Sequence, residues 1–114
     1  MRNQQMRRGD IVICVISGDY GKPRPAVVVQ SDLFNPTHPS VVVCPITSHL
    51  TDAHLFRLPL KPLDTNGLSS ESQIMVDKLT TIKVEKVREK VGNLSKHETQ
   101  KLDDALKLWL NLID

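Results

Sequence analysis

Three short runs of β-branched and other apolar residues limit what this chain can fold into more than any other feature. They occupy residues 11–16, 26–30 and 41–46, with the sequences IVICVI, AVVVQ and VVVCPI. Turn-forming residues bound each run, and each is too short and too rich in valine and isoleucine for a helix. The three runs therefore predict buried β-strands joined by loops.

The middle of the chain predicts further strands. Residues 54–60 alternate loosely between apolar and polar, and Pro59 indicates that this strand lies at a sheet edge or ends there, because proline cannot donate a ladder hydrogen bond. Residues 61–70 are rich in turn formers, whereas residues 73–77 and 79–82 again have strand composition. We therefore expect five or six short strands between about residues 9 and 82.

The C-terminal segment changes to a helical period. Ser95 and Glu98 have the spacing of a capping box, which satisfies the first free N–H groups of a helix. Apolar side chains then recur at helical spacing, at Leu102, Ala105, Leu106, Trp109, Leu110 and Ile113. A helix over about 96–113 is predicted, with Trp109 packed into the core. Strands followed by one helix favour a compact β-barrel or sandwich with a C-terminal helix.

The length of 114 residues fits one domain spanning residues 1–114. A domain of this size buries only about two-thirds of the surface that its unfolded chain exposes, so dimerisation is a natural source of further burial. The hydrophobic share of 39% excludes a disordered protein as the class. The net charge of +2 is too small to indicate a nucleic-acid partner by itself.

The cysteines and histidines lack metal-binding spacing. Cys14 and Cys44 lie inside apolar runs, so we expect buried free thiols in a reducing cytoplasm. His38, His54 and His97 are expected to be surface or structural residues, and neither a metal nor a cofactor is predicted. Residues 1–8 are polar and basic and no long apolar segment follows, so we expect a cytoplasmic protein without a membrane span. Walker A, HExxH and GxSxG motifs do not occur.

Residues 17–24 form a polar loop between two predicted strands, and such loops often carry function. Pro23 and Pro25 flank Arg24 and stiffen the backbone around it. Arg24 is either a solvated residue at the start of a strand or a phosphate ligand, since its planar guanidinium matches a phosphate bidentately.

Two more polar positions adjoin predicted strands. Thr47, Ser48 and His49 end the third run, either as ordinary strand-end residues or as part of a site. Asp77 interrupts the apolar residues 74–76, and it is either a turn residue or a carboxylate directed at a site.

Four segments together resemble the successive motifs of the MazF/PemK toxin family. They are residues 8–12 (RGDIV), 21–30 (GKPRPAVVVQ), 44–48 (CPITS) and 73–78 (QIMVDK), and the resemblance spans nearly the whole chain. It implies an SH3-like barrel that forms a homodimer with a groove across its interface. It also implies a type II toxin–antitoxin toxin that cleaves single-stranded RNA, such as mRNA, at short sequence motifs without a metal ion.

The resemblance also implies roles for single residues. Arg24 and Thr47 match two family positions, the first to stabilise the phosphorane and the second to position the phosphate while a ribose 2′-OH attacks. The products would be a 2′,3′-cyclic phosphate and a 5′-OH. Asp77 matches an aspartate that is a general base in some relatives. However, Met75 and Thr80 stand where some relatives carry arginine.

Further residues and partners follow from the same resemblance. Candidate RNA contacts are Ser17, Lys22, Ser48, His49 and Lys78. The protein partner would be an antitoxin whose disordered C-terminal segment folds over the groove. Two alternatives are a toxin like CcdB, which has the same fold and binds gyrase, with Trp109 as a contact, or an inactive domain that binds an antitoxin. A nuclease needs both Arg24 and Thr47, while a gyrase binder needs neither.

Overall fold

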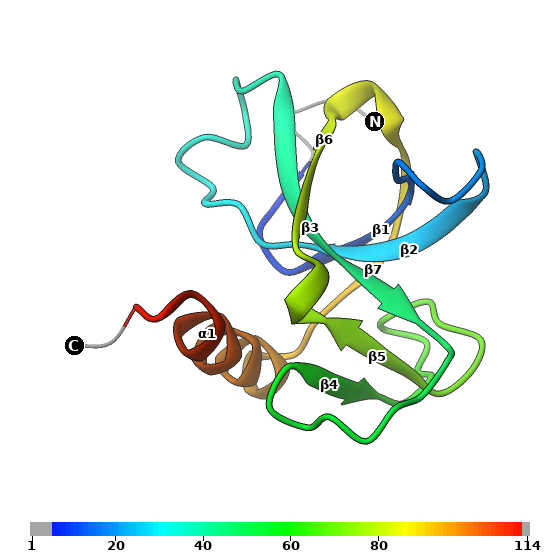
Figure 1. Cartoon of the computed structure of the whole chain (residues 1–114). Coiled ribbons are helices and arrows are strands. Elements are labelled where there is room, and N and C mark those ends of the chain that lie inside the picture. Colours follow the sequence, from blue (N-terminus) through cyan, green and yellow to red (C-terminus); the bar gives the residue numbers. More distant parts are fainter. Residues whose placement is uncertain (1–5, 113–114) are drawn as a thin grey trace.

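Seven strands followed by one helix make up the fold (Figure 1), and the computed structural model describes residues 6–112. The elements, in chain order, are β1 (Asp10–Val15), β2 (Pro23–Val28), β3 (Ser40–Thr47), β4 (Arg57–Leu60), β5 (Ser72–Met75), β6 (Thr80–Lys83), β7 (Val87–Asn93) and α1 (Lys96–Leu110). Single turns of 3₁₀ helix, Val76–Lys78 and Val84–Lys86, precede and follow β6. The predicted class, mainly β with a C-terminal helix, is confirmed.

All strand pairs are antiparallel, and the strands follow the order β4-β5-β3-β2-β1-β7. The long strand β3 has two neighbours along one edge, because its first half pairs with β6 and its last two residues pair with β5. The 3₁₀ turn between these neighbours carries the chain from one to the other. The sheet curls so that β1, β2, β3, β6 and β7 surround one core (Figure 1). This curled sheet is the arrangement expected of an SH3-like barrel.

Both faces of the central strands are buried, which explains their continuous apolar runs. In β1, Val12 and Cys14 point into the curl, while Ile11 points to the opposite face, where β4, β5 and α1 pack. Strand β3 alternates in the same way, with Val43 on the inner side and Cys44 on the outer side. The cysteines are free and buried, as predicted. Burial raises the pKa of Cys14 to about 11 and that of Cys44 to about 12, so both thiols stay protonated.

Helix α1 begins as predicted and packs less completely than predicted. The Ser95 hydroxyl accepts a hydrogen bond from the Glu98 amide at 3.1 Å, and the Ser95 amide donates to the Glu98 carboxylate at 2.8 Å. Leu102 and Ala105 are buried against the sheet. Trp109 is 47% exposed and rests on Phe56, with ring centroids 5.3 Å apart. The prediction of a core Trp109 was wrong because the second half of α1 has only this partial cover; Ile113 lies outside the described residues.

Other predicted boundaries differ from the structure. Strand β7 was not expected, because its sequence VREKVGN has three charged residues in a row and no apolar alternation; it forms by pairing with β1. The strands therefore extend to residue 93 and do not end near residue 82. Strand β2 begins at Pro23, which places Arg24 inside a strand. Asp77 lies in a 3₁₀ turn, beyond the end of β5. Pro59 does lie in a strand at one end of the sheet, as predicted.

Candidate functional site

Arg24 and Thr47 lie at one cavity because of the pairing between β2 and β3. In this pair Ala26 is opposite Pro45, and extending the antiparallel register by two residues sets Arg24 opposite Thr47. Both residues line a cavity of about 250 Å³. The remaining wall comes from Ser48 after β3, from the ends of neighbouring strands and from residues 68–70. The two primary candidates are thus brought together at the ends of two adjacent strands.

The Arg24 side chain is held by a carboxylate from the preceding loop. Asp19 Oδ2 lies 2.9 Å from Arg24 Nε, and the two side chains are 26% and 29% exposed. No described residue forms a hydrogen bond with the terminal amino groups of Arg24, so these groups are available to a ligand. No role was predicted for Asp19. Its position in the short polar loop before Arg24 is the one sequence feature that points to it.

Two tight turns place Asp19 beside Arg24. The Asp19 amide donates to Ile16 O at 3.1 Å, and the Lys22 amide donates to Asp19 O at 3.0 Å. Gly18 and Gly21 have φ of +96° and +77°, in the region that glycine occupies without steric cost. The loop is therefore folded back toward β2 by local hydrogen bonds.

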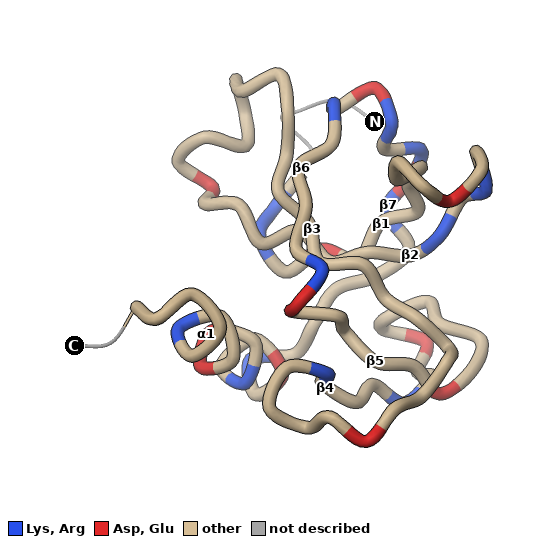
Figure 2. Tube along the Cα trace, in the orientation of Figure 1, with Lys and Arg blue, Asp and Glu red and all other residues tan. Residues whose placement is uncertain are grey.

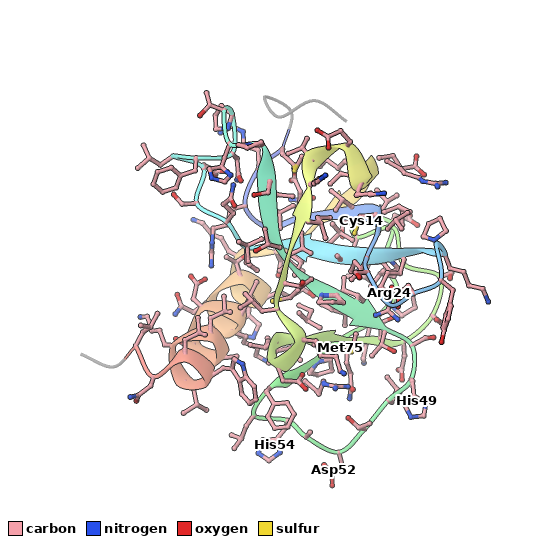
Figure 3. The ribbon with its side chains drawn as sticks, turned by 45° about the horizontal axis from the view of Figure 1, so that its top comes forward. Cys14, Arg24, His49, Asp52, His54 and Met75 are labelled. Atoms are coloured by element: carbon pink, nitrogen blue, oxygen red, sulfur yellow. The ribbon has the colours of Figure 1, made fainter. Side chains whose placement is uncertain are left out.

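A second cavity of about 370 Å³ lies on the other side of Arg24. Ser17, Asp19, Arg24, Lys78 and Thr80 line it, together with the buried Met75. Arg24 lines both cavities, so the two cavities are neighbours. Figure 3 shows Arg24 and Met75 on neighbouring parts of the molecule. Ser17 and Lys78, both predicted RNA contacts, lie at this site.

Thr47 and two predicted RNA contacts, His49 and Lys22, have further features of their own. Thr47 Oγ1 accepts a hydrogen bond from the His49 amide at 3.0 Å, which is ordinary strand-end geometry even though Thr47 also lines the cavity. His49 is exposed on the loop between β3 and β4, which also carries Asp52 and His54 (Figure 3). Lys22 is exposed on the β1–β2 loop and lines neither cavity beside Arg24.

Asp77 is engaged elsewhere. Its two carboxylate oxygens accept hydrogen bonds from Arg57 Nε at 2.8 Å and from Arg57 Nη2 at 3.1 Å. The side chains are 16% and 12% exposed, so the pair is mostly shielded from water. The hydrogen bonds from Arg57 lower the pKa of Asp77. Asp77 does not line either cavity with Arg24, and its partner Arg57 could not be identified from a position so distant in sequence.

A buried asparagine fixes the loop that forms one wall of the smaller cavity. Asn66 is 1% exposed, and its Oδ1 accepts hydrogen bonds from the amides of Leu63 and Leu68, both at 3.0 Å. Its Nδ2 donates to Lys61 O at 2.8 Å. Gly92 of β7 lies directly against this loop, where a Cβ would be 2.4 Å from Thr65 O. These contacts hold Leu68 beside Arg24 and Thr47.

The described part of the molecule carries positive and negative charges without a large region of one sign. Basic and acidic positions are interleaved along the trace (Figure 2). Within residues 6–112, no group of three or more His, Cys, Asp or Glu residues is arranged to hold a metal ion. In the same part of the chain, no helix is long and apolar enough to cross a membrane.

Comparisons with known proteins agree with this architecture. The family described as PemK-like, MazF-like toxin of type II toxin-antitoxin system matches residues 7–110. The probable endoribonuclease MazF of Mycolicibacterium smegmatis is 41% identical over 108 residues, which cover 94% of this chain and 98% of that protein.

Two solved structures share the fold. The Mycobacterium tuberculosis toxin MazF-mt6 superposes with a TM-score of 0.80 at 24% identity, covering 92% of this chain and 99% of that chain. A mycobacterial endoribonuclease in complex with its cognate antitoxin also has a TM-score of 0.80, at 18% identity, with 96% and 98% covered. Because the family match spans most of its length, the chain belongs to the PemK-like, MazF-like toxins of type II toxin–antitoxin systems.

Proposed function

We propose that this protein is a toxin that acts as an endoribonuclease and cleaves single-stranded RNA, including mRNA, at short sequence motifs without a metal ion. The observation that carries the proposal is the placement of Arg24 and Thr47 at one cavity, at the ends of β2 and β3. The name of the 41% identical relative, probable endoribonuclease MazF, supports the same activity.

The chemistry proceeds without a nucleophile from the protein. The 2′-oxygen of a ribose attacks the adjacent phosphorus, and the P–O5′ bond breaks, which leaves a 2′,3′-cyclic phosphate and a 5′-OH. The 2′-OH loses its proton and the departing 5′-oxygen gains one. Arg24 stabilises the negative charge that develops on the phosphorane through its terminal amino groups, while its Nε is paired with Asp19. Thr47 positions the phosphate from the opposite strand.

The general-base role expected of Asp77 has little support. Both of its oxygens accept hydrogen bonds from Arg57, and a lowered pKa weakens a carboxylate as a proton acceptor. Asp19 is the carboxylate that lines a cavity with Arg24. In the proposed reaction the 2′ proton passes to water, Asp19 anchors Arg24, and Asp77 has a structural role.

RNA binding extends over both sides of Arg24. Ser48 lies in the smaller cavity, and Ser17 and Lys78 lie in the larger one, where hydroxyl and ammonium groups can bind sugar and phosphate. Lys22 and His49 lie on the exposed loops that flank the site and would contact RNA at its margins.

The partners follow from the family. A disordered C-terminal segment of a cognate antitoxin would cover the RNA site of a homodimer, since coupled folding and binding suits an extended surface. A structure similar in fold is a complex of an endoribonuclease with its cognate antitoxin. Action on mRNA also implies that the protein works in the cytoplasm.

The test is incubation of the purified protein with a long, unstructured RNA in EDTA, followed by sequencing of fragment ends and analysis of the termini. We expect cuts at a short recurring motif with 2′,3′-cyclic phosphate ends. Arg24→Ala should abolish cleavage and leave the fold intact. Cleavage by Arg24→Ala would refute the mechanism, and intact RNA with wild-type protein would favour a gyrase-binding toxin or an inactive antitoxin-binding domain.

A further inference from the structure

A third cavity, of about 620 Å³, is larger than either cavity beside Arg24 and has no role in the reaction above. It lies between the β1–β2 loop and strand β6 with the turn that follows it. The residues that line it include Ile82, Tyr20, Lys83 and Lys86.

This cavity adjoins the proposed site. Ile16, Ser17, Gly18 and Thr80 line both this cavity and the 370 Å³ cavity next to Arg24. Arg24 in turn belongs to the cavity that contains Thr47. The three cavities therefore adjoin one another in sequence, and a strand bound at Arg24 could extend toward the third.

Tyr20 presents an exposed aromatic ring beside the third cavity. The residue is 98% exposed, and its φ of +54° is in the left-handed region that side chains other than glycine rarely adopt. Gly18 and Gly21, also at positive φ, hold the loop that displays it. Residues other than glycine that are held at positive φ cluster at ligand-binding loops.

The charged side chains around the third cavity suit a phosphate. Lys83 and Lys86 are exposed, and neither forms an ion pair with another residue in the described part of the chain. The described residues that line the cavity include no aspartate or glutamate. Uncompensated ammonium groups beside an aromatic ring are the combination that binds unpaired nucleotides.

We infer that this cavity is a subsite for a nucleotide that flanks the cleaved phosphate, with its base stacked on Tyr20 and its phosphate bound by Lys83 and Lys86. The inference rests on the proposed function, and it adds a base-selecting element to that function. Tyr20 thereby contributes to which RNA sequences are cut, while Arg24 and Thr47 act on the bond itself.

The first experiment maps cut sites in the same long RNA with wild type, Tyr20→Phe and Tyr20→Asn. Phenylalanine keeps the ring, and asparagine removes it while tolerating the left-handed backbone. Tyr20→Phe should match wild type. Tyr20→Asn should lower kcat/KM about tenfold, the effect of losing one stacked base, and should flatten the base preference at one flanking position.

The second experiment measures the salt dependence of binding to that RNA. The double variant Lys83→Gln/Lys86→Gln should raise KM and reduce the slope of log K against log salt by about 1.4, since each phosphate of a single strand that a lysine neutralises adds about 0.7 to that slope. The matched control is Lys101→Gln/Lys107→Gln, which removes the same charge from exposed positions of α1 and should leave the slope unchanged.

The outcomes separate the two proposals. If wild-type protein cuts no RNA, the proposed function fails, and the subsite fails with it. If wild type cuts and Tyr20→Asn keeps the same rate and base preference, the subsite alone is overturned. If Tyr20→Asn differs from wild type in molar mass by light scattering but not in cleavage, this face contacts a second copy of the chain. That result would also overturn the subsite.

Discussion

Gly92→Ala should destabilise the protein through one close backbone contact. A Cβ at this position would lie 2.4 Å from Thr65 O and 2.5 Å from Asn66 Cα, whereas ordinary contact begins at 3.4 Å. The loop around Asn66 must therefore retreat by about 1 Å, from 3.4 minus 2.4, and backbone atoms cannot rotate away as a flexible side chain can.

The free-energy cost has three components. Overpacking costs about 1–3 kcal/mol. The hydrogen bond from the Asn93 amide to Thr65 O, now 2.9 Å, would weaken and add about 1 kcal/mol. Alanine restricts the unfolded chain, which offsets about 0.4–1 kcal/mol. The net expected loss of unfolding free energy is about 1–3.6 kcal/mol, or a fall in Tm of roughly 4–14 °C for a domain of this size.

Denaturant unfolding measures the total loss of unfolding free energy, and amide hydrogen exchange shows which part of the structure is affected. The amides of Leu63, Leu68 and Asn93 should lose protection in Gly92→Ala, because all three donate to the loop that must move. The control is Gly21→Ala, which has no atom within 4 Å of the added Cβ and suffers only from its φ of +77°. It should cost about 1 kcal/mol and leave those amides protected. A Gly92→Ala protein within about 0.5 kcal/mol of wild type, with these amides still protected, would refute the steric reasoning.

Three further substitutions test contacts at and around the site. Asp19→Asn removes a partly exposed ion pair, so the free energy of unfolding should change by less than about 1 kcal/mol. Single-turnover cleavage should fall about tenfold or more, because Arg24 loses its anchor. An unchanged cleavage rate would exclude that anchoring role. Asp77→Asn should cost about 1–3 kcal/mol in denaturant unfolding and keep cleavage by the folded protein within a few-fold, so a loss of activity without a loss of stability would restore the general-base role. Because the pKa of Asp77 is lowered in the folded state, its contribution to stability is present above the unfolded pKa of about 3.9 and disappears as the pH falls through the folded pKa; Asp77→Asn should lack this component in an acid titration of stability. Trp109→Ala should cost about 1–2 kcal/mol, less than a core tryptophan, because the ring is 47% exposed and rests on Phe56 alone among described aromatic rings; a loss above 3 kcal/mol in denaturant unfolding would contradict this packing.

The elements that could be predicted from the sequence are those whose cause is local. The β-branched runs of β1 and β3 predict strands because side-chain shape and burial act within a few residues. The capping box at Ser95 and Glu98 marks the start of α1, since both partners lie in one turn. The placement of Arg24 and Thr47 in a shared site came from the resemblance to a family, and the register of β2 and β3 supplies its physical basis.

Other features depend on residues that meet only after folding. Strand β7 has three consecutive charged residues and forms because β1 offers an unpaired edge, which the sequence of β7 itself does not encode. Asp77 could have faced either a site or a turn until β4 brought Arg57 within 2.8 Å. Helix α1 carries a continuous apolar stripe, yet the sheet covers only its first half. The sequence alone therefore determined strand and helix composition and the candidate arginine, because these follow from short-range chemistry. The tertiary structure decided which carboxylate pairs with which arginine and where the cavities lie, because those depend on strand register and long-range packing.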